Sequence, residues 1–194
     1  MKKVISVLLV AMLVLSFAAC GAGDKGDNGD KGNESTIASP VELLNNVWAT
    51  YEDAEKFPAA GGDMTEANQN MEGPGVYDLE DAEGFMAITH FPGNAMEKID
   101  SAATLMHMMN ANTMTVAAYH VVEGTNMDNL AEVVTTSVMG TQWMCGFPEK
   151  LVIVTVEDYM VSYFGNGEIV DTFTAKLTAA YPAAEVVVDE AIVA

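Results

Sequence analysis

Residues 151–164 have the sequence LVIVTVEDYMVSYF and decide the fold class. Two runs rich in apolar and β-branched residues, 151–156 and 159–164, are separated only by Glu157 and Asp158, which predicts two strands joined by a tight hairpin turn. A third run, TMTVAAYHVV at 113–122, predicts another strand. Strands joined by a hairpin pair in antiparallel fashion, so we expect a largely antiparallel sheet.

Amphipathic helices are predicted around these strands. Ser39 is a suitable N-cap, Pro40 suits the first helical position, and Glu42 completes a capping box. Apolar residues at helical spacing and start or stop signals predict further helices at 95–109, 127–139 and 167–181. A helical turn at 78–83, an extended piece at 85–89, a long loop at 57–75 and an edge strand at 185–193 complete the assignment. Each amphipathic helix must cover an apolar surface, so the simplest arrangement is a two-layer α+β fold with helices on one face of a small sheet.

The N-terminus has the pattern of a lipoprotein signal. Lys2 and Lys3 precede the uncharged residues 4–19, a stretch shorter than the roughly 20 residues of a membrane-spanning helix. Small residues followed directly by Cys20 resemble the lipobox of bacterial lipoproteins. That resemblance implies that residues 1–19 are removed and that the Cys20 thiol carries a diacylglyceryl anchor, whose two chains would hold the protein on the outer face of the cell membrane. An ordinary secretory signal is the alternative.

Residues 20–38 then form a tether rich in Gly, Asp, Asn and Lys, and 39–194 form one domain. The chain has 28 acidic residues, eight lysines and no arginine, for a formal net charge of -20. Of these residues, 24 acids and four lysines follow Ser39, so the excess of negative charge belongs mainly to the domain. This composition argues against nucleic acid as a partner, because phosphates and bases are bound mainly by clustered Lys and Arg.

No catalytic or cofactor motif is present: the sequence contains no G-x-S-x-G, H-E-x-x-H, Walker loop or dinucleotide-binding glycine pattern. Cys145 is the one thiol left if Cys20 is lipidated, and it could pair with a histidine for nucleophilic catalysis. Its apolar neighbours instead favour an inert structural cysteine, since reactive thiolates need an electropositive setting. The three histidines are His90, His107 and His120.

The segment Met106-His107-Met108-Met109, with Met114, contains ligand types that suit Cu(I). On the predicted helix His107 points away from Met106 and Met109, so core packing is favoured over a partner-binding surface or a copper site. Acidic groups could bind Ca²⁺, but solvated acidic surfaces are the preferred interpretation; they are Asp78, Glu80, Asp81 and Glu83, and Glu52, Asp53 and Glu55. We therefore expect no cofactor and no resident metal.

Residues 99–182 resemble a group of small lipid-anchored lipoproteins of unknown function from Gram-positive anaerobes, some of them labelled bacteriocin transport accessory. The resemblance is carried by TMTVAAYHVVEG, NMDNLAEVV, TQWMCGFPEK and LVIVTVEDYMVSYFG, at 113–124, 126–134, 141–150 and 151–165. It implies a location and a fold rather than an activity. Some proteins with that label look like thioredoxins, but this chain has no C-x-x-C pair, so a redox activity does not carry over.

These observations predict an extracytoplasmic binding or accessory lipoprotein without catalytic activity. It would bind the membrane through its anchor and a protein or small-molecule partner at the cell surface. The alternatives are a cell-surface enzyme that uses Cys145 or scattered carboxylates, and a metal or solute scavenger that uses the Met/His cluster.

Overall fold

The computed structural model describes residues 36–63, 65–144 and 146–193. No helix in these ranges is long and apolar enough to cross a membrane. The elements follow in the order α1 (Pro40–Trp48), β1 (Ala59–Ala60), β2 (Gly75–Tyr77), α2 (Ala82–Thr89), the 3₁₀ helix η1 (Gly93–Lys98), β3 (Ile99–His107), the 3₁₀ helix η2 (Ala111–Thr113), β4 (Met114–Val121), α3 (Met127–Met139), β5 (Lys150–Val156), β6 (Tyr159–Gly165), α4 (Gly167–Ala180) and β7 (Glu185–Ala191).

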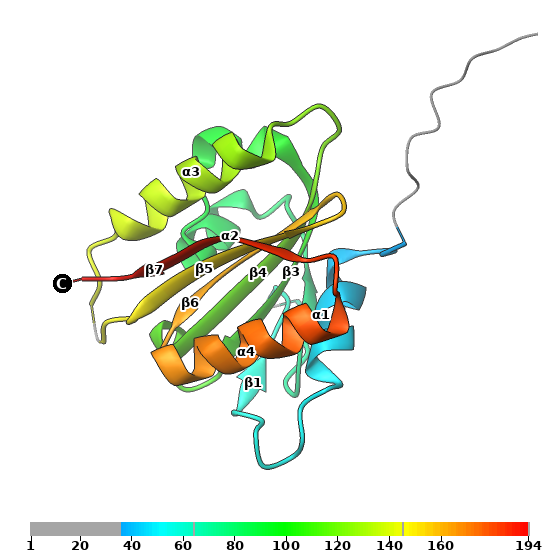
Figure 1. Cartoon of the computed structure of the whole chain (residues 1–194), viewed down its shortest axis with the longest axis vertical. Helices are drawn as coiled ribbons and strands as arrows, with labels where there is room; N and C mark the ends of the chain where they lie inside the picture. Colours follow the sequence, from blue (N-terminus) through cyan, green and yellow to red (C-terminus); the bar gives the residue numbers. More distant parts are fainter. Residues whose placement is uncertain (1–35, 64, 145, 194) are drawn as a thin grey trace, which may run out of the picture. The chain divides into compact units, whose positions relative to one another are not determined.

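The strands of the described residues form one seven-stranded sheet in the order β1-β3-β4-β6-β5-β7, with β2 also paired to β3 (Figure 1). Every pairing is antiparallel. The predicted hairpin is confirmed, because Val156 pairs with Tyr159 across the turn and the ladder continues to Lys150 and Gly165. The predicted edge strand is confirmed as β7, which pairs with β5.

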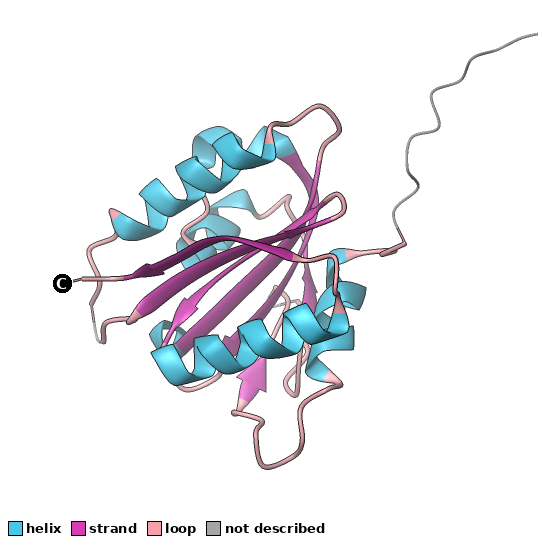
Figure 2. Ribbon diagram, viewed as in Figure 1, coloured by secondary structure: helices cyan, strands magenta, loops and turns pink. Residues whose placement is uncertain are grey.

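Helices lie on both faces of this sheet, α1 and α4 on one and α2 and α3 on the other (Figure 2). The α+β class and the antiparallel sheet are therefore confirmed, but the expected single helical layer is wrong. Alternate side chains explain the difference: Val152 and Val154 enter one core, whereas Leu151 and Ile153 enter the other. A strand that is apolar at successive positions is buried on both faces, so each face needs its own cover.

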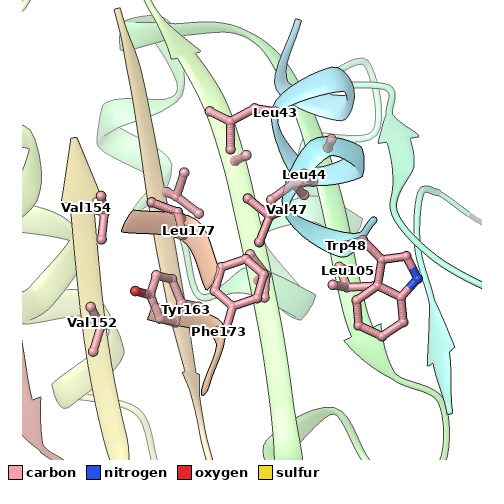
Figure 3. Close-up of a cluster of buried hydrophobic side chains, with 14 of the residues drawn as sticks. Leu43, Leu44, Val47, Trp48, Leu105, Val152, Val154, Tyr163, Phe173 and Leu177 are labelled. Carbon is pink, nitrogen blue, oxygen red and sulfur yellow. The ribbon is translucent and has the colours of Figure 1, made fainter. Parts of the chain in front are cut away.

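The first core joins α1 and α4 to the sheet (Figure 3). Phe173 of α4 packs edge-on against Tyr163 of β6, with 4.8 Å between their ring centroids. The second core joins α2 and α3 to the opposite face through fully buried side chains such as Phe85 and Val134. Both cores use the same central strands, so the sheet is the shared layer of the domain.

Three of the predicted helices begin where expected, but the first ends at Trp48 and does not continue through the acidic residues 52–55 toward Pro58 as the sequence predicts. The Ser39 hydroxyl accepts a hydrogen bond from the Glu42 N–H (3.2 Å) at the start of α1. Asn126 caps α3 by accepting from the Asn129 N–H (2.8 Å), and Asn166 caps α4 by accepting from the Glu168 N–H (3.2 Å). These starts are predictable because a cap is a contact between residues two or three apart.

Two predicted elements are wrong. The helix expected at 95–109 is instead η1 followed by strand β3, and the extended piece expected at 85–89 is the second half of helix α2. Residues 99–107 include Ala, Leu and Met, which favour helices in isolation. In the folded domain β3 pairs with β4 on one side and with β1 and β2 on the other, and these distant partners outweigh local preference.

The stretch 57–75, expected as a long loop, contains β1 and is organised around Asp63, a buried carboxylate. Asp63 accepts hydrogen bonds from Thr65, from the Asn68 amide (2.7 Å) and from the Asp78 N–H (3.1 Å). Burial alone would raise the pKa of Asp63, but these hydrogen bonds outweigh burial and lower it to about 2. Gly62 has φ 85°, and a Cβ there would lie 2.1 Å from the Asn68 carbonyl oxygen, so only glycine fits this turn.

Candidate functional site

The two ends of the central strands differ in what they carry. The β5–β6 turn at Glu157 and Asp158 lies at one end, together with the start of β3 and the end of β4. The start of β5, the end of β6 and the end of β7 lie at the other. A seven-residue strand separates the ends by roughly 20 Å.

The first of these ends holds Thr36 and Ile37, the first described residues, and we name it the tether end. The Glu157 carboxylate accepts hydrogen bonds from the N–H of Thr36 (2.8 Å) and from the N–H of Ile37 (3.3 Å). The Tyr159 hydroxyl donates to the Ile37 carbonyl (2.9 Å), and the Ile37 side chain is buried in the first core. Thr36 and Ile37, which the sequence assigned to the tether, are therefore part of the folded domain.

The second end carries exposed apolar side chains. Among the described residues, the four most exposed large apolar side chains all lie here: Val193 (87%), Met144 (79%), Met109 (78%) and Phe147 (62%). We name these four residues the apolar end. They come from the β3–β4 turn, the α3–β5 connection and the C-terminal residues after β7. Exposed apolar groups are ordinary when scattered, but their collection at one end of a domain is typical of a binding surface.

Hydrogen bonds hold these three segments together. The Asn112 amide donates to the carbonyl oxygens of Met144 (3.1 Å) and Gly146 (2.9 Å), which joins the β3–β4 turn to the α3–β5 connection. The Ile192 N–H donates to the Glu149 carbonyl (2.9 Å), which places Val193 beside the α3–β5 connection. Hydrogen bonds between the β3–β4 turn, the α3–β5 connection and the C-terminal residues therefore support the apolar end.

A small polar cavity lies beside this end, with a volume of about 240 Å³. Its lining includes the amides of Asn110, Asn112 and Asn166, the Phe147 ring and the Glu149 carboxylate. Glu149 accepts from the Gly167 N–H (2.8 Å) at the start of α4.

Positive charge is scarce on the described domain, and what exists is paired. Each of the four lysines after Ser39 lies within 3.4 Å of a carboxylate oxygen: Lys56–Asp53, Lys98–Glu97, Lys150–Asp171 and Asp189, and Lys176–Glu55. Lys150 donates hydrogen bonds to the carboxylates of Asp171 and Asp189, and these bonds raise the pKa of Lys150, so this lysine stays charged and bound. The remaining carboxylates leave the domain strongly anionic.

The cysteines that the sequence singled out, Cys20 and Cys145, lie outside the described residues, as does the predicted signal segment. The three histidines do not share a site. His107 lies at the end of β3, where its ring stacks on Phe57 (5.7 Å between centroids), while His120 pairs with Asp100 (2.8 Å) toward the tether end. His90 lies in the left-handed conformation after α2, with its ring against Trp143 (4.7 Å).

The sequence predicts that the methionines of the Met/His segment pack in the core, and this prediction is wrong for Met108 and Met109. Met114 is buried, but Met108 and Met109 lie exposed in the β3–β4 turn. The prediction failed because residues 99–107 form a strand and not part of a helix. Met108 and Met109 follow the end of that strand and lie in the turn, outside the sheet. The His107 Nδ1 accepts the Met109 N–H (3.3 Å), so the turn uses this ring nitrogen.

The acidic groups expected to be solvated take part in local hydrogen bonds. Asp81 accepts from the Gly84 N–H (3.1 Å) as the cap of α2, and Asp78 accepts from the Glu80 N–H (2.9 Å). Glu55 binds Lys176 (2.7 Å). Within 36–63, 65–144 and 146–193, no group of three or more His, Cys, Asp or Glu side chains is arranged to hold a metal ion.

The apolar end was missed at the sequence level because its members are far apart in the chain. In the sequence Met109 belongs to a run of methionines, whereas Met144 and Phe147 flank Cys145, and no pattern connects the two segments. The one available signal was the high methionine count of 14, since methionine suits adaptable binding surfaces as well as cores. No protein-family model matches the chain, and no curated protein or solved structure is significantly similar to it.

Proposed function

We propose that the protein is a lipid-anchored accessory lipoprotein on the extracytoplasmic face of the membrane, which binds a partner and has no catalytic activity of its own. Cys20 carries the diacylglyceryl anchor, residues 21–35 link it to the domain, and the apolar end receives the partner.

The single observation that supports this proposal is that the tether end and the apolar end lie at opposite ends of the central strands. The N-terminal chain joins at Thr36 and Ile37, which bind Glu157 and Tyr159 at the tether end. The four most exposed large apolar side chains of the described residues lie at the opposite end of the same strands. A domain attached at one end and apolar at the other presents its binding surface away from the point of attachment. This arrangement suits an adaptor that holds a partner at the cell surface.

The anchor is tested by labelling cells with a radioactive or alkyne-bearing fatty acid and then fractionating them. We expect label on the wild-type chain and its recovery with membranes, and loss of the label in a Cys20→Ser variant. A wild-type chain that takes up no lipid and is released into the medium would contradict the anchored location.

The binding role is tested on intact cells with a photoreactive phenylalanine analogue, benzoylphenylalanine, placed singly along the chain. We expect a discrete crosslinked product from position 147 at the apolar end. The matched control is position 186, which is exposed on β7 toward the tether end. Equal crosslinking from both positions, or none from position 147 when the protein is present on the surface, would contradict a partner at the apolar end.

A further inference from the structure

The apolar end lies beside an acidic surface, and this combination indicates the chemistry of the partner. Glu149 immediately precedes β5 and accepts a hydrogen bond from the first N–H of α4. Glu168 lies in the first turn of α4, and Glu190 of β7 pairs with Leu151 of β5. All three are exposed. The lysine of this region, Lys150, is already bound by Asp171 and Asp189, so it does not offset these charges.

We infer that the apolar end binds a cationic amphipathic segment of another protein, with its apolar side chains against Met109, Met144 and Phe147 and its lysines or arginines toward the flanking carboxylates. The inference rests on the proposed function, because it names the partner of that same surface. Methionine side chains are flexible and polarizable, so they adapt to apolar groups of different shape. Complementary charge adds rate and selectivity to such a contact.

The same charges argue against two other occupants. A second copy would bring another domain with 24 acids and four lysines against the first, and like charges at an interface oppose association. An anionic lipid surface would be repelled in the same way, and the apolar end is opposite to the point where the tether joins. A cationic segment is the occupant that both the apolar side chains and the carboxylates favour.

The test uses purified full-length protein in phosphatidylcholine nanodiscs, with empty nanodiscs as the blank. Three synthetic 14-residue peptides serve as probes: Lys/Leu in an amphipathic helical pattern, Glu/Leu in the same pattern, and Lys/Ser. We expect saturable binding of the Lys/Leu peptide that weakens as salt is added, and much weaker binding of the other two. Peptide affinity is a property of the domain, whereas fatty-acid labelling reports on Cys20, so failure of this inference and failure of the proposed anchor are distinguishable.

Variants then locate the surface. Met109→Gln combined with Met144→Gln removes apolar groups from exposed positions where folding does not need them, and should raise the Kd for the Lys/Leu peptide by about tenfold or more. Val193→Thr at the apolar end should weaken binding severalfold. Val186→Thr, the same exchange near the opposite end of the same C-terminal segment, should leave it unchanged.

Several results would overturn the inference. Equal affinity for the Lys/Ser peptide would show attraction by charge alone, and equal affinity for the Glu/Leu peptide would show that charge has no role. Unchanged binding by the double variant would place the contact elsewhere. Concentration-dependent dimers that the double variant abolishes would identify a second copy as the occupant. Flotation of detergent-free protein with anionic vesicles that the double variant abolishes would identify a lipid surface as the occupant.

Discussion

The carboxylate of Glu157 accepts a hydrogen bond from the backbone N–H of Thr36 (2.8 Å) and another from the Thr36 hydroxyl. The two residues are 121 positions apart, so this contact ties the start of the domain to the β5–β6 turn. It also places the first described residues at the tether end of the sheet.

Replacement of Glu157 by Gln should therefore loosen the tether end without unfolding the domain. The amide keeps the shape of the side chain but loses the charge that strengthens these hydrogen bonds, so we expect a loss of about 1 kcal/mol in the free energy of unfolding. Urea denaturation measures the loss, and hydrogen exchange should show faster exchange at Thr36 and Ile37. Glu132→Gln, on the exposed side of α3, is the control and should change neither quantity.

Asp63→Asn should destabilise the loop between β1 and β2. The amide cannot accept all the hydrogen bonds that Thr65, Asn68 and Asp78 donate to the carboxylate, and the site is buried, so we expect a cost of about 2–3 kcal/mol. If the Asp63→Asn variant has the same urea midpoint of unfolding as the wild type, the carboxylate does not organise the loop.

The same carboxylate predicts a pH dependence in acid. The pKa of Asp63 is lowered from 3.8 to about 2 in the folded domain, so the unfolded chain binds its proton first as the pH falls. The stability that Asp63 contributes is complete above pH 3.8 and is lost as the pH falls through about 2. The difference in unfolding free energy between wild type and Asp63→Asn should shrink across this window, and a constant difference would contradict the assignment.

His90 predicts a second pH effect at milder acidity. Burial against Trp143 and Phe164 lowers the pKa of His90 below its usual 6.5, because the charged ring loses solvation. The neutral ring is favoured in the folded state, so stability is full above pH 6.5 and declines as the pH falls through the lowered pKa. His90→Asn tolerates the left-handed backbone (φ 56°) and cannot titrate, so its stability should vary less between pH 5 and 7.

Helices on both faces of the sheet predict that each core is needed. Phe173→Ala removes a fully buried ring from the first core and Phe85→Ala removes one from the second. Each should cost about 3–5 kcal/mol in unfolding free energy. Exposed Val133→Ala on α3 is the control, with an expected change of no more than about 0.5 kcal/mol. A neutral Phe85→Ala would mean that α2 does not pack on the sheet in solution.

The structure of residues 95–109 decides whether two methionines are buried or exposed. On the helix that the sequence predicts there, Met108 and Met109 are expected to pack in the core. As the end of a strand and the turn after it, the same residues lie beyond the sheet and are exposed. One error in secondary structure thus concealed the surface on which the proposed function depends.

The single-layer arrangement failed for a related reason. The runs at 151–156 and 159–164 are apolar at nearly every position, which is typical of strands buried on both faces. The hairpin was recognised from the same residues, but how many layers cover it depends on where helices distant in the chain return to the sheet.

The sequence by itself determined the antiparallel hairpin, the starts of helices α1, α3 and α4, the Ser39 cap, and the acidic, arginine-free composition. These features depend on composition or on contacts between residues a few positions apart, which local patterns record. Only the tertiary structure decided that β3 is a strand, that helices cover both faces, and that Met109, Met144, Phe147 and Val193 share one end. Those outcomes depend on backbone pairing and packing between residues tens of positions apart, and no local pattern specifies which distant segments will meet.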